Sequence, residues 1–431
     1  MYRSSIKQLI EWKLDESKKP LIFLGARQVG KTYLIQEFGR TEYKQMVYIN
    51  FERADEMQGV FQRDLDPKRL ITAFEFYSGM KIAPGDTLIV LDEIQAAARG
   101  ITSLKYFCEE AREYQIIAAG SLLGINMHAE ESFPVGKVDM MTLYPMSFYE
   151  FLLAMGEENG LARILREKHL DMTPVFAGKF KEFLKYYFYV GGMPEAVAAF
   201  AGNRDWKKAR QVQNKILKTY RSDFSKHAPK EILPRIYMVW DSIPAQLAKE
   251  NRKFIYGVLR EGARAKDFEL AIQWLTDAGL LHKIHAVAKP AIPLIAYQDF
   301  SAFKLYHNDL GLLAAMSKLN AKTLIKGNEF FEEFKGALTE QYVFQQLKLN
   351  EELSLNYYPF ENGRYELDFI IQNEDDELIP IEVKAGETLN AKSFKYFCEK
   401  HKPSKAIRTS LSDYQQESWM TNLPLYAINT I

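Results

Sequence analysis

The chain has 431 residues, a length that corresponds to roughly two to four domains. Its 56 Lys and Arg residues balance its 56 Asp and Glu residues, which argues against a protein that coats nucleic acid through overall charge but leaves a local basic groove open. No apolar run approaches the ~20 residues of a membrane helix, so no membrane partner is expected. Cys108 and Cys398 show no zinc spacing and the N-terminus has no apolar signal core, which predicts a cytoplasmic protein.

The first motif is a glycine-rich turn between a short apolar run and a helical pattern. Residues 25–32 fit G-x-x-x-x-G-K-[ST] at every specified position, with the apolar run 21–24 before them and helical spacing over 33–38 after them. The glycines let successive backbone N–H groups face phosphates, and the helix N-terminus adds unpaired donors and positive dipole. The pattern predicts an ATP site made by Gly25, Ala26, Arg27, Gln28, Val29, Gly30, Lys31, Thr32 and Tyr33.

Two of these residues have specific predicted roles, which a second motif complements. Lys31 is expected to reach the β- and γ-phosphates, and Thr32 to bind Mg²⁺. The apolar run 88–91 predicts a strand buried on both faces, and it ends in Asp92 and Glu93. With a P-loop upstream, Asp92 is predicted to hold Mg²⁺ and Glu93 to deprotonate the attacking water; a capped strand end is the structural alternative.

The segments around these motifs alternate between strand and helix. Such alternation predicts a parallel, three-layer α/β domain. The expected strands are 46–51, 116–119 and 138–143, and the expected helices are 67–77 and 104–113.

Ser121 follows the expected strand 116–119, at the end where ligands bind in parallel sheets. It is predicted to contact the γ-phosphate or the attacking water. A turn residue after glycine is an equal alternative, and both interpretations stay open.

The middle of the chain is predicted to be helical and then winged-helix-like. Apolar stripes indicate helices from 148 to about 230, including one over 215–224. From about 232 to 287 the pattern resembles a winged helix, with short helices over 235–240 and 244–247, a helix over 266–278 and a strand over 280–284. Basic side chains before that third helix stand where phosphate contacts would fall, although winged helices also contact proteins: Arg260, Arg264 and Lys266.

The last third carries a second set of acidic residues. Glu340 lies in an expected helix, Asp368 in an expected strand, and Glu382 and Lys384 on one face of the next strand. The three carboxylates are hard oxygen ligands for a divalent metal, and Lys384 could position water or stabilise a pentavalent phosphorus. This arrangement predicts a metal-dependent phosphodiester cleavage site, with a solvated strand face as the alternative.

Several short motifs together resemble one family. They are residues 25–32, 91–95, 119–121, 143–148, 191–195, 303–306, 309–313 and 381–385. Across nearly its full length the chain resembles prokaryotic AAA-type ATPases whose C-terminal half is a domain of unknown function with a PD-(D/E)xK, restriction-endonuclease-like fold. The resemblance implies the α/β class, with a P-loop NTPase parallel sheet over 1–150, a helical lid over 151–230, a winged-helix-like domain over 231–300 and a nuclease-like α/β domain over 301–431.

The chain departs from that family at one position. Such ATPases often carry an arginine before the last core strand that reaches a neighbouring subunit's nucleotide, whereas this chain has Lys137. Lys lacks the planar fork of Arg, which argues against a homo-oligomeric ring with a shared site. Arg27 could act in cis instead, or simply cover the edge of the nucleotide.

The sequence therefore predicts a Mg²⁺-dependent ATPase coupled to a nuclease-like domain that acts on or binds nucleic acid. The rival interpretation is an ATP-dependent switch, in which the C-terminal fold is an inactive binding module. A GTPase is less expected, because the chain has no Asn-Lys-x-Asp motif.

Overall fold

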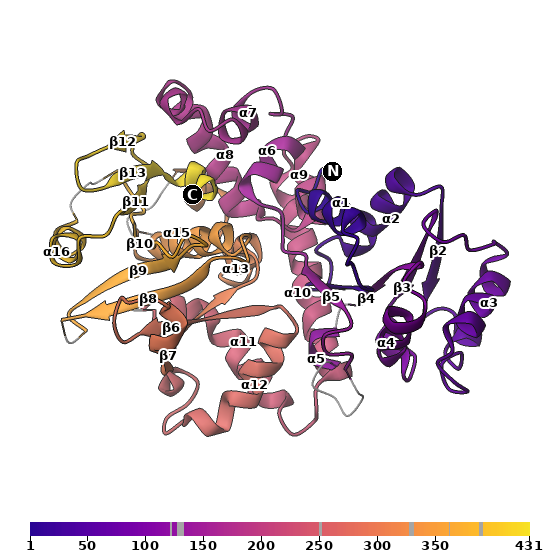
Figure 1. The fold of residues 1–431 in the computed structure, drawn as a ribbon. Coiled ribbons are helices and arrows are strands. Elements are labelled where there is room, and N and C mark those ends of the chain that lie inside the picture. The colour runs from indigo at the N-terminus through magenta and orange to yellow at the C-terminus, as the bar shows by residue number, and fades with distance from the viewer. Residues whose placement is uncertain (121–122, 127–132, 250–251, 327–331, 362, 388–390) are drawn as a thin grey trace. The chain divides into compact units, whose positions relative to one another are not determined.

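The computed structural model describes the chain except for residues 121–122, 127–132, 250–251, 327–331, 362 and 388–390 (Figure 1). The described residues form two compact units. The N-terminal unit holds residues 2–144 and 277–279, and the C-terminal unit holds residue 1, residues 145–276 and residues 280–431. In the part of the chain that is described, no helix is both long and apolar enough to cross a membrane.

The N-terminal unit is built on a five-stranded, fully parallel sheet, as the alternation of its segments predicts. The strands lie in the order β2-β3-β4-β1-β5, so β1 and β3 flank β4 near the middle. All residues of β3 are buried, which agrees with its continuous apolar run. The strands are β1 Leu21–Leu24, β2 Gln45–Asn50, β3 Thr87–Asp92, β4 Gln115–Ala119 and β5 Asp139–Thr142.

The helices of this unit begin and end at local sequence signals. Helix α3 starts after Asp66, whose side chain accepts the Lys68 N–H, has Pro67 in its first turn and ends at Gly79 in the left-handed region. The predicted helices are all present, and α4 starts before residue 104, the expected start. The helices are α1 Ile6–Leu14, α2 Lys31–Glu42, α3 Pro67–Ser78, α4 Gly100–Glu110 and α5 Leu123–Asn126, with short 3₁₀ turns η1 Asp55–Met57 and η2 Ile94–Ala96.

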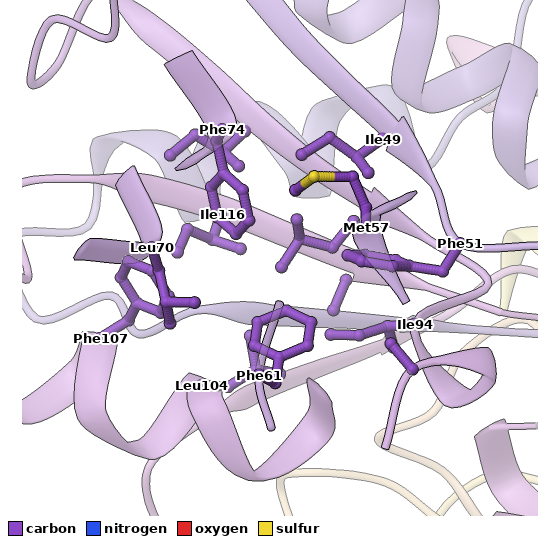
Figure 2. Close-up of a cluster of buried hydrophobic side chains, with 14 of the residues drawn as sticks. Ile49, Phe51, Met57, Phe61, Leu70, Phe74, Ile94, Leu104, Phe107 and Ile116 are labelled. Carbon is purple, nitrogen blue, oxygen red and sulfur yellow. The ribbon is translucent and has the colours of Figure 1, made fainter. Parts of the chain in front are cut away.

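One apolar core cluster of this unit lies where α3 and α4 cover the sheet (Figure 2). Phe74 of α3 stacks on Phe107 of α4, and Phe61 packs against Phe74 from the connection before α3. Apolar residues of β2 and β4, such as Ile49 and Ile116, close the same cluster. Burial of this apolar surface fixes the sheet whose strand ends carry the predicted site.

The C-terminal unit contains more residues in helices than in strands. The expected pieces 235–240 and 244–247 form one helix, α11, which continues through Pro244 because its buried residues Ile236, Trp240 and Ile243 fall on one face. The expected helix 215–224 is the middle of α10. The helices are α6 Phe148–Ala154, α7 Leu161–Arg166, α8 Ala177–Val190, α9 Pro194–Ala201, α10 Trp206–His227, α11 Leu233–Leu247, α12 Ala265–Asp277, α13 Leu310–Met316, α14 Ala321–Lys326, α15 Glu332–Leu347 and α16 Lys392–His401, with 3₁₀ turns η3 Leu170–Phe176, η4 Tyr256–Val258, η5 Leu294–Tyr297 and η7 Leu425–Thr430.

One mixed, eight-stranded sheet runs through this unit in the order β12-β13-β11-β10-β9-β8-β6-β7. The expected strand 280–284 is part of β6, which pairs antiparallel with β7 and parallel with β8. The predicted domain boundary at 300/301 falls inside β7, so the segments on both sides of it share this sheet. The strands are β6 Leu281–Val287, β7 Gln298–His307, β8 Ser354–Phe360, β9 Tyr365–Gln372, β10 Leu378–Val383, β11 Ile407–Ser410, β12 Gln415–Gln416 and β13 Thr421–Pro424.

A buried aspartate joins the helical part of this unit to α13. Asp309 caps α13 by accepting the Leu312 N–H at 2.9 Å, and it also accepts the Gly192 N–H at 2.6 Å. A Cβ on Gly191, which has φ +71°, would lie 2.3 Å from Asp309 Oδ1. Burial raises the pKa of Asp309 to about 6, with the backbone N–H donors acting against that rise. Gly191 therefore leaves no room for a side chain beside Asp309.

A buried lysine joins the sheet to α15. Lys304 Nζ of β7 lies 3.0 Å from Glu340 Oε1 on α15 and 2.6 Å from Glu366 Oε1 on β9. The side chains of Lys304 and Glu340 are both 0% exposed, and Tyr306 Oη also donates to Glu340. An ammonium group removed from water is tolerated only when carboxylates compensate it, so this cluster fixes three elements against one another.

We expect Lys304→Met to lower the free energy of unfolding by about 3–5 kcal/mol, because it leaves the buried Glu340 and the half-buried Glu366 with less compensation. Urea denaturation followed by circular dichroism would measure the loss. Lys266→Met, at an exposed position of α12, is the matched control and should change stability by no more than about 0.5 kcal/mol. Equal transitions for the two variants would contradict the structural importance of the buried ammonium group.

Candidate functional site

The P-loop connects β1 to α2 and has the backbone that its glycines predict. Gly25 has φ +136° and Gly30 has φ +97°. A Cβ on Gly25 would lie 2.4 Å from the backbone oxygen of Leu143, so no side chain fits there. Gly30 caps α2 without a side-chain hydrogen bond, which leaves the first N–H groups of the helix to an anion.

Lys31, the first residue of α2, is buried inside this loop. Its Nζ donates to the backbone oxygens of Gly25 at 2.5 Å and Ala26 at 3.1 Å. Burial lowers the pKa of Lys31 to about 8, and the negative charges of Glu93 and Asp92 act against that change. The structure therefore brings the two sequence motifs into electrostatic contact.

Asp92 ends β3 with its carboxylate held by neighbours from β2. Tyr48 Oη donates to Asp92 Oδ2, and Asn50 Nδ2 lies 3.3 Å from the same oxygen. The Glu93 N–H donates to Asp92 Oδ1 at 3.1 Å. Burial raises the pKa of Asp92, and the hydrogen bond from Tyr48 opposes that rise. Tyr48 and Asn50 were absent from the sequence analysis, although strand alternation puts them on one face and Asn50 is in register with Asp92.

Glu93 lies where the chain turns sharply out of the strand. Its φ of 50° and ψ of 41° are left-handed values, which cost a non-glycine residue roughly 1–3 kcal/mol and are concentrated at functional sites. Gln95 Nε2 donates to Glu93 Oε2 at 2.5 Å. This turn allows Asp92 and Glu93 to face the same region although they are adjacent, as the sequence argument requires.

The remaining predicted nucleotide contacts surround the loop. Thr32 and Tyr33 are exposed on the first turn of α2. Arg27 is half-buried, and its positive charge contributes to the lowered pKa of Lys31. Ser121 lies outside the described residues, so its predicted phosphate contact stays a prediction.

Lys137 is the residue at the place of the family's arginine. Its Nζ lies 2.9 Å from Glu109 Oε1 of α4. The ammonium group therefore has an ion-pair partner within its own unit, and the expectation that it is a poor finger stays a prediction.

Arg3 also supports the loop, and the sequence gives no signal for it. Its guanidinium donates to the backbone oxygens of Val29 at 2.7 Å and Tyr144 at 2.5 Å, and the side chain is buried. It thus ties the P-loop to the segment that follows β5.

The C-terminal acids gather where the middle of β9, which carries Asp368, lies beside the end of β10, which carries Glu382. Asp368 Oδ2 accepts the Val383 N–H at 2.8 Å, and Lys384 Nζ lies 2.5 Å from Glu382 Oε1. Glu382 and Lys384 are therefore neighbours, as strand alternation predicts. Burial raises the pKa of Glu382 to about 7, with a further rise from the charge of Asp368 and an opposing effect of Lys384.

Glu340 has cationic partners of its own. It contacts Lys304 and Tyr306, and Arg252 Nη1 forms an ion pair with its Oε2. Arg252 also lies 3.8 Å from Asp368 Oδ1. Among the residues that the structure describes, no group of three or more His, Cys, Asp or Glu is arranged to hold a metal ion.

The prediction that Glu340 joins Asp368 and Glu382 as a metal ligand thus does not match this arrangement, because positive side chains already neutralise Glu340. Sequence analysis missed Lys304 and Arg252. A lysine inside the apolar strand 302–306 is a usable signal for a buried ion pair, whereas Arg252 gives none.

Comparison with known families assigns the first part of the chain. Residues 17–152, which include the P-loop and the Asp92-Glu93 pair, match the family model described as an AAA domain. The match supports a P-loop AAA-type ATPase domain in this part of the chain. Residues 181–323 match a domain of unknown function (DUF8612), and residues 335–428 match another (DUF4143). No curated protein matches the chain.

Solved structures with similarity to the chain include a Walker-type ATPase and an ORC1 protein. The Walker-type ATPase PABY2304 of Pyrococcus abyssi is 14% identical over 73% of this chain and 95% of its own, with a TM-score of 0.46. The Aeropyrum pernix ORC1 protein, solved in complex with DNA, is 14% identical over 73% of this chain and 91% of its own, with a TM-score of 0.28. Because both TM-scores are low, the assignment of residues 17–152 rests on the family model and on the geometry of the P-loop.

We expect Lys31→Ala to weaken ATP binding by about 10-fold or more, because a hydrogen bond to a charged group contributes about 1.5–3 kcal/mol. Titration with a fluorescent ATP analogue would measure the dissociation constant. Lys44→Ala removes an exposed ammonium group from the same unit and should leave the constant unchanged. Unaltered binding in the Lys31 variant would contradict the assignment of the site.

Proposed function

We propose that the N-terminal unit binds ATP with Mg²⁺ and hydrolyses it. The observation that carries this proposal is the position of Lys31 inside the P-loop, within the electrostatic reach of Asp92 and Glu93. The Thr32 hydroxyl and the Asp92 carboxylate are hard oxygen donors of the kind that Mg²⁺ prefers. When bound, Mg²⁺ would neutralise charge on the β- and γ-phosphate oxygens.

Residues of the N-terminal unit would bind the phosphates and activate the attacking water. The N-terminal N–H groups of α2 and the Lys31 ammonium group would bind phosphate oxygens and orient the γ-phosphoryl group. Glu93 would accept the proton of the water that attacks the γ-phosphorus, while the bond from that phosphorus to the β-phosphate oxygen breaks. Gln95 supports this role, since it holds the Glu93 carboxylate at 2.5 Å. We keep the γ-phosphate contact of Ser121 as part of the proposal.

We expect Glu93→Gln to keep ATP affinity within about threefold but to hydrolyse ATP ~10²–10⁴-fold more slowly, because glutamine cannot take a proton. Phosphate release under saturating ATP would give the rate, and analogue titration the affinity. Glu56→Gln, an exposed substitution in the same unit, should match the unaltered protein. A collapse of affinity would instead make Glu93 structural, and an unchanged rate would assign the base elsewhere.

For the C-terminal unit, we propose a nuclease-like function that acts on or binds nucleic acid. Support comes from the proximity of Asp368, Glu382 and Lys384, and from the Oε2 atom of Glu382, which is buried without a hydrogen-bond partner among the described residues. An orphaned carboxylate oxygen fits a hard divalent cation. Asp368 and Glu382 would hold that cation, which would polarise the scissile phosphate, and Lys384 would orient water.

A specific observation favours the alternative in which this fold only binds and ATP controls the binding. Lys304 and Arg252 already compensate Glu340, as a structural ion-pair cluster would. In that case nucleic acid could still bind through the basic residues before α12, of which Arg260 pairs with Asp267. Metal-dependent cleavage of plasmid or oligonucleotide separates the two functions.

We expect Mn²⁺ to raise the melting temperature of the nucleotide-free full-length protein, and Asp368→Asn to remove most of that rise. Saturation at about 100 times the dissociation constant would contribute about 2.7 kcal/mol. Asp375→Asn, in an exposed turn, should retain the full effect. If Mn²⁺ does not stabilise the protein and no DNA or RNA is cleaved, the C-terminal unit would be a binding module.

A further inference from the structure

Neither the ATP site nor the proposed metal site explains the position of Arg252. It lies in the connection between α11 and η4, with a side chain that is only 19% exposed. Its guanidinium contacts Glu340 Oε2 and lies 3.8 Å from Asp368 Oδ1. One guanidinium group thus spans carboxylates from α15 and β9. Its planar fork suits two acceptors, which the point charge of a lysine does not.

The charged side chains around Arg252 indicate which kind of ion could take the place of its guanidinium group. Lys384 lies against Glu382, and Lys304 lies between Glu340 and Glu366. Arg252 reaches Asp368 in this cluster. Without Arg252, the four carboxyl groups of the cluster would be opposed by the two lysines alone. The larger excess of negative charge would favour a bound cation.

We propose that Arg252 and a divalent cation are mutually exclusive occupants of the C-terminal site. In the metal-free protein the guanidinium lies beside Asp368, and a divalent cation binds to Asp368 and Glu382 only after the guanidinium has moved away. This inference rests on the proposed metal-binding function of Asp368 and Glu382.

The alternative is that Arg252 is a fixed structural partner of Glu340. The two roles differ in their thermodynamics. A competitor that must leave lowers the apparent affinity for the cation through its charge and its fit to the two carboxylates, whereas a fixed partner acts on the cation through its charge alone, which R252K keeps. The metal dissociation constant therefore tests the proposal without any measurement of cleavage.

The experiment is a Mn²⁺ titration of the nucleotide-free full-length protein, with free Mn²⁺ followed by electron paramagnetic resonance. R252Q should bind Mn²⁺ about 10-fold more tightly than the unaltered protein, within the usual range of coupling between competing sites. The double variant R252Q/D368N should lose that gain, because it removes a ligand. R163Q, which removes an arginine beside the carboxylate of Glu167, is the matched control and should bind as the unaltered protein does.

A second variant covers the case in which R252Q does not fold. R252K keeps the charge but loses the fork, so it should bind Mn²⁺ more tightly than the unaltered protein, though by less than R252Q. Equal Mn²⁺ affinity in the unaltered protein and in every folded Arg252 variant overturns the competition while leaving the metal site standing. No Mn²⁺ binding to any of these proteins overturns the competition and the proposed metal site together.

Discussion

The C-terminal unit depends on the compensation of one ammonium group that has no access to water. Lys304 is fully buried, so its charge must be balanced by Glu340 and Glu366 at the positions that β7, α15 and β9 give them. A displacement of any of these elements by a few ångströms would leave a bare charge in a low dielectric, with a cost of several kcal/mol. Geometry at this point is therefore tightly specified, in contrast to apolar contacts, which tolerate small shifts.

The same helix, α15, carries a row of buried glutamines that extends this control to other segments. Gln341 bonds to both backbone groups of His307, at 2.9 Å and 2.7 Å. Gln345 accepts the Leu310 N–H at 2.8 Å, and Gln346 accepts the Phe148 N–H at 2.9 Å. Each amide satisfies a backbone group where a strand ends or a helix begins, which the helix and sheet ladders cannot do. Helix α15 thus serves as a polar scaffold inside the unit.

Local signals in the sequence predict the ATPase domain well, because its decisive features lie within a few residues of each other. The P-loop needs glycine at 25 and 30 for backbone reasons, and the acids at 92 and 93 directly end a buried run. The contacts that could not be predicted join residues far apart in the sequence, such as Arg3 with Tyr144 and Arg252 with Glu340. Helix α11 shows a second limit, since Pro244 suggests a break that burial of one helical face overrides.

The bond between Phe148 and Gln346 also has a consequence for how the chain folds during its synthesis. Its partners are 198 residues apart, and the bond between Gly192 and Asp309 spans 117 residues. At typical translation speeds of about 5–20 residues per second, the start of α6 waits roughly 10–40 seconds for its acceptor. Helices α6 to α10 therefore emerge from the ribosome well before α13 and α15 can complete their packing, with apolar faces uncovered. The nascent chain is most exposed to aggregation in that interval, and a chaperone that binds it would engage these helices rather than the parallel sheet.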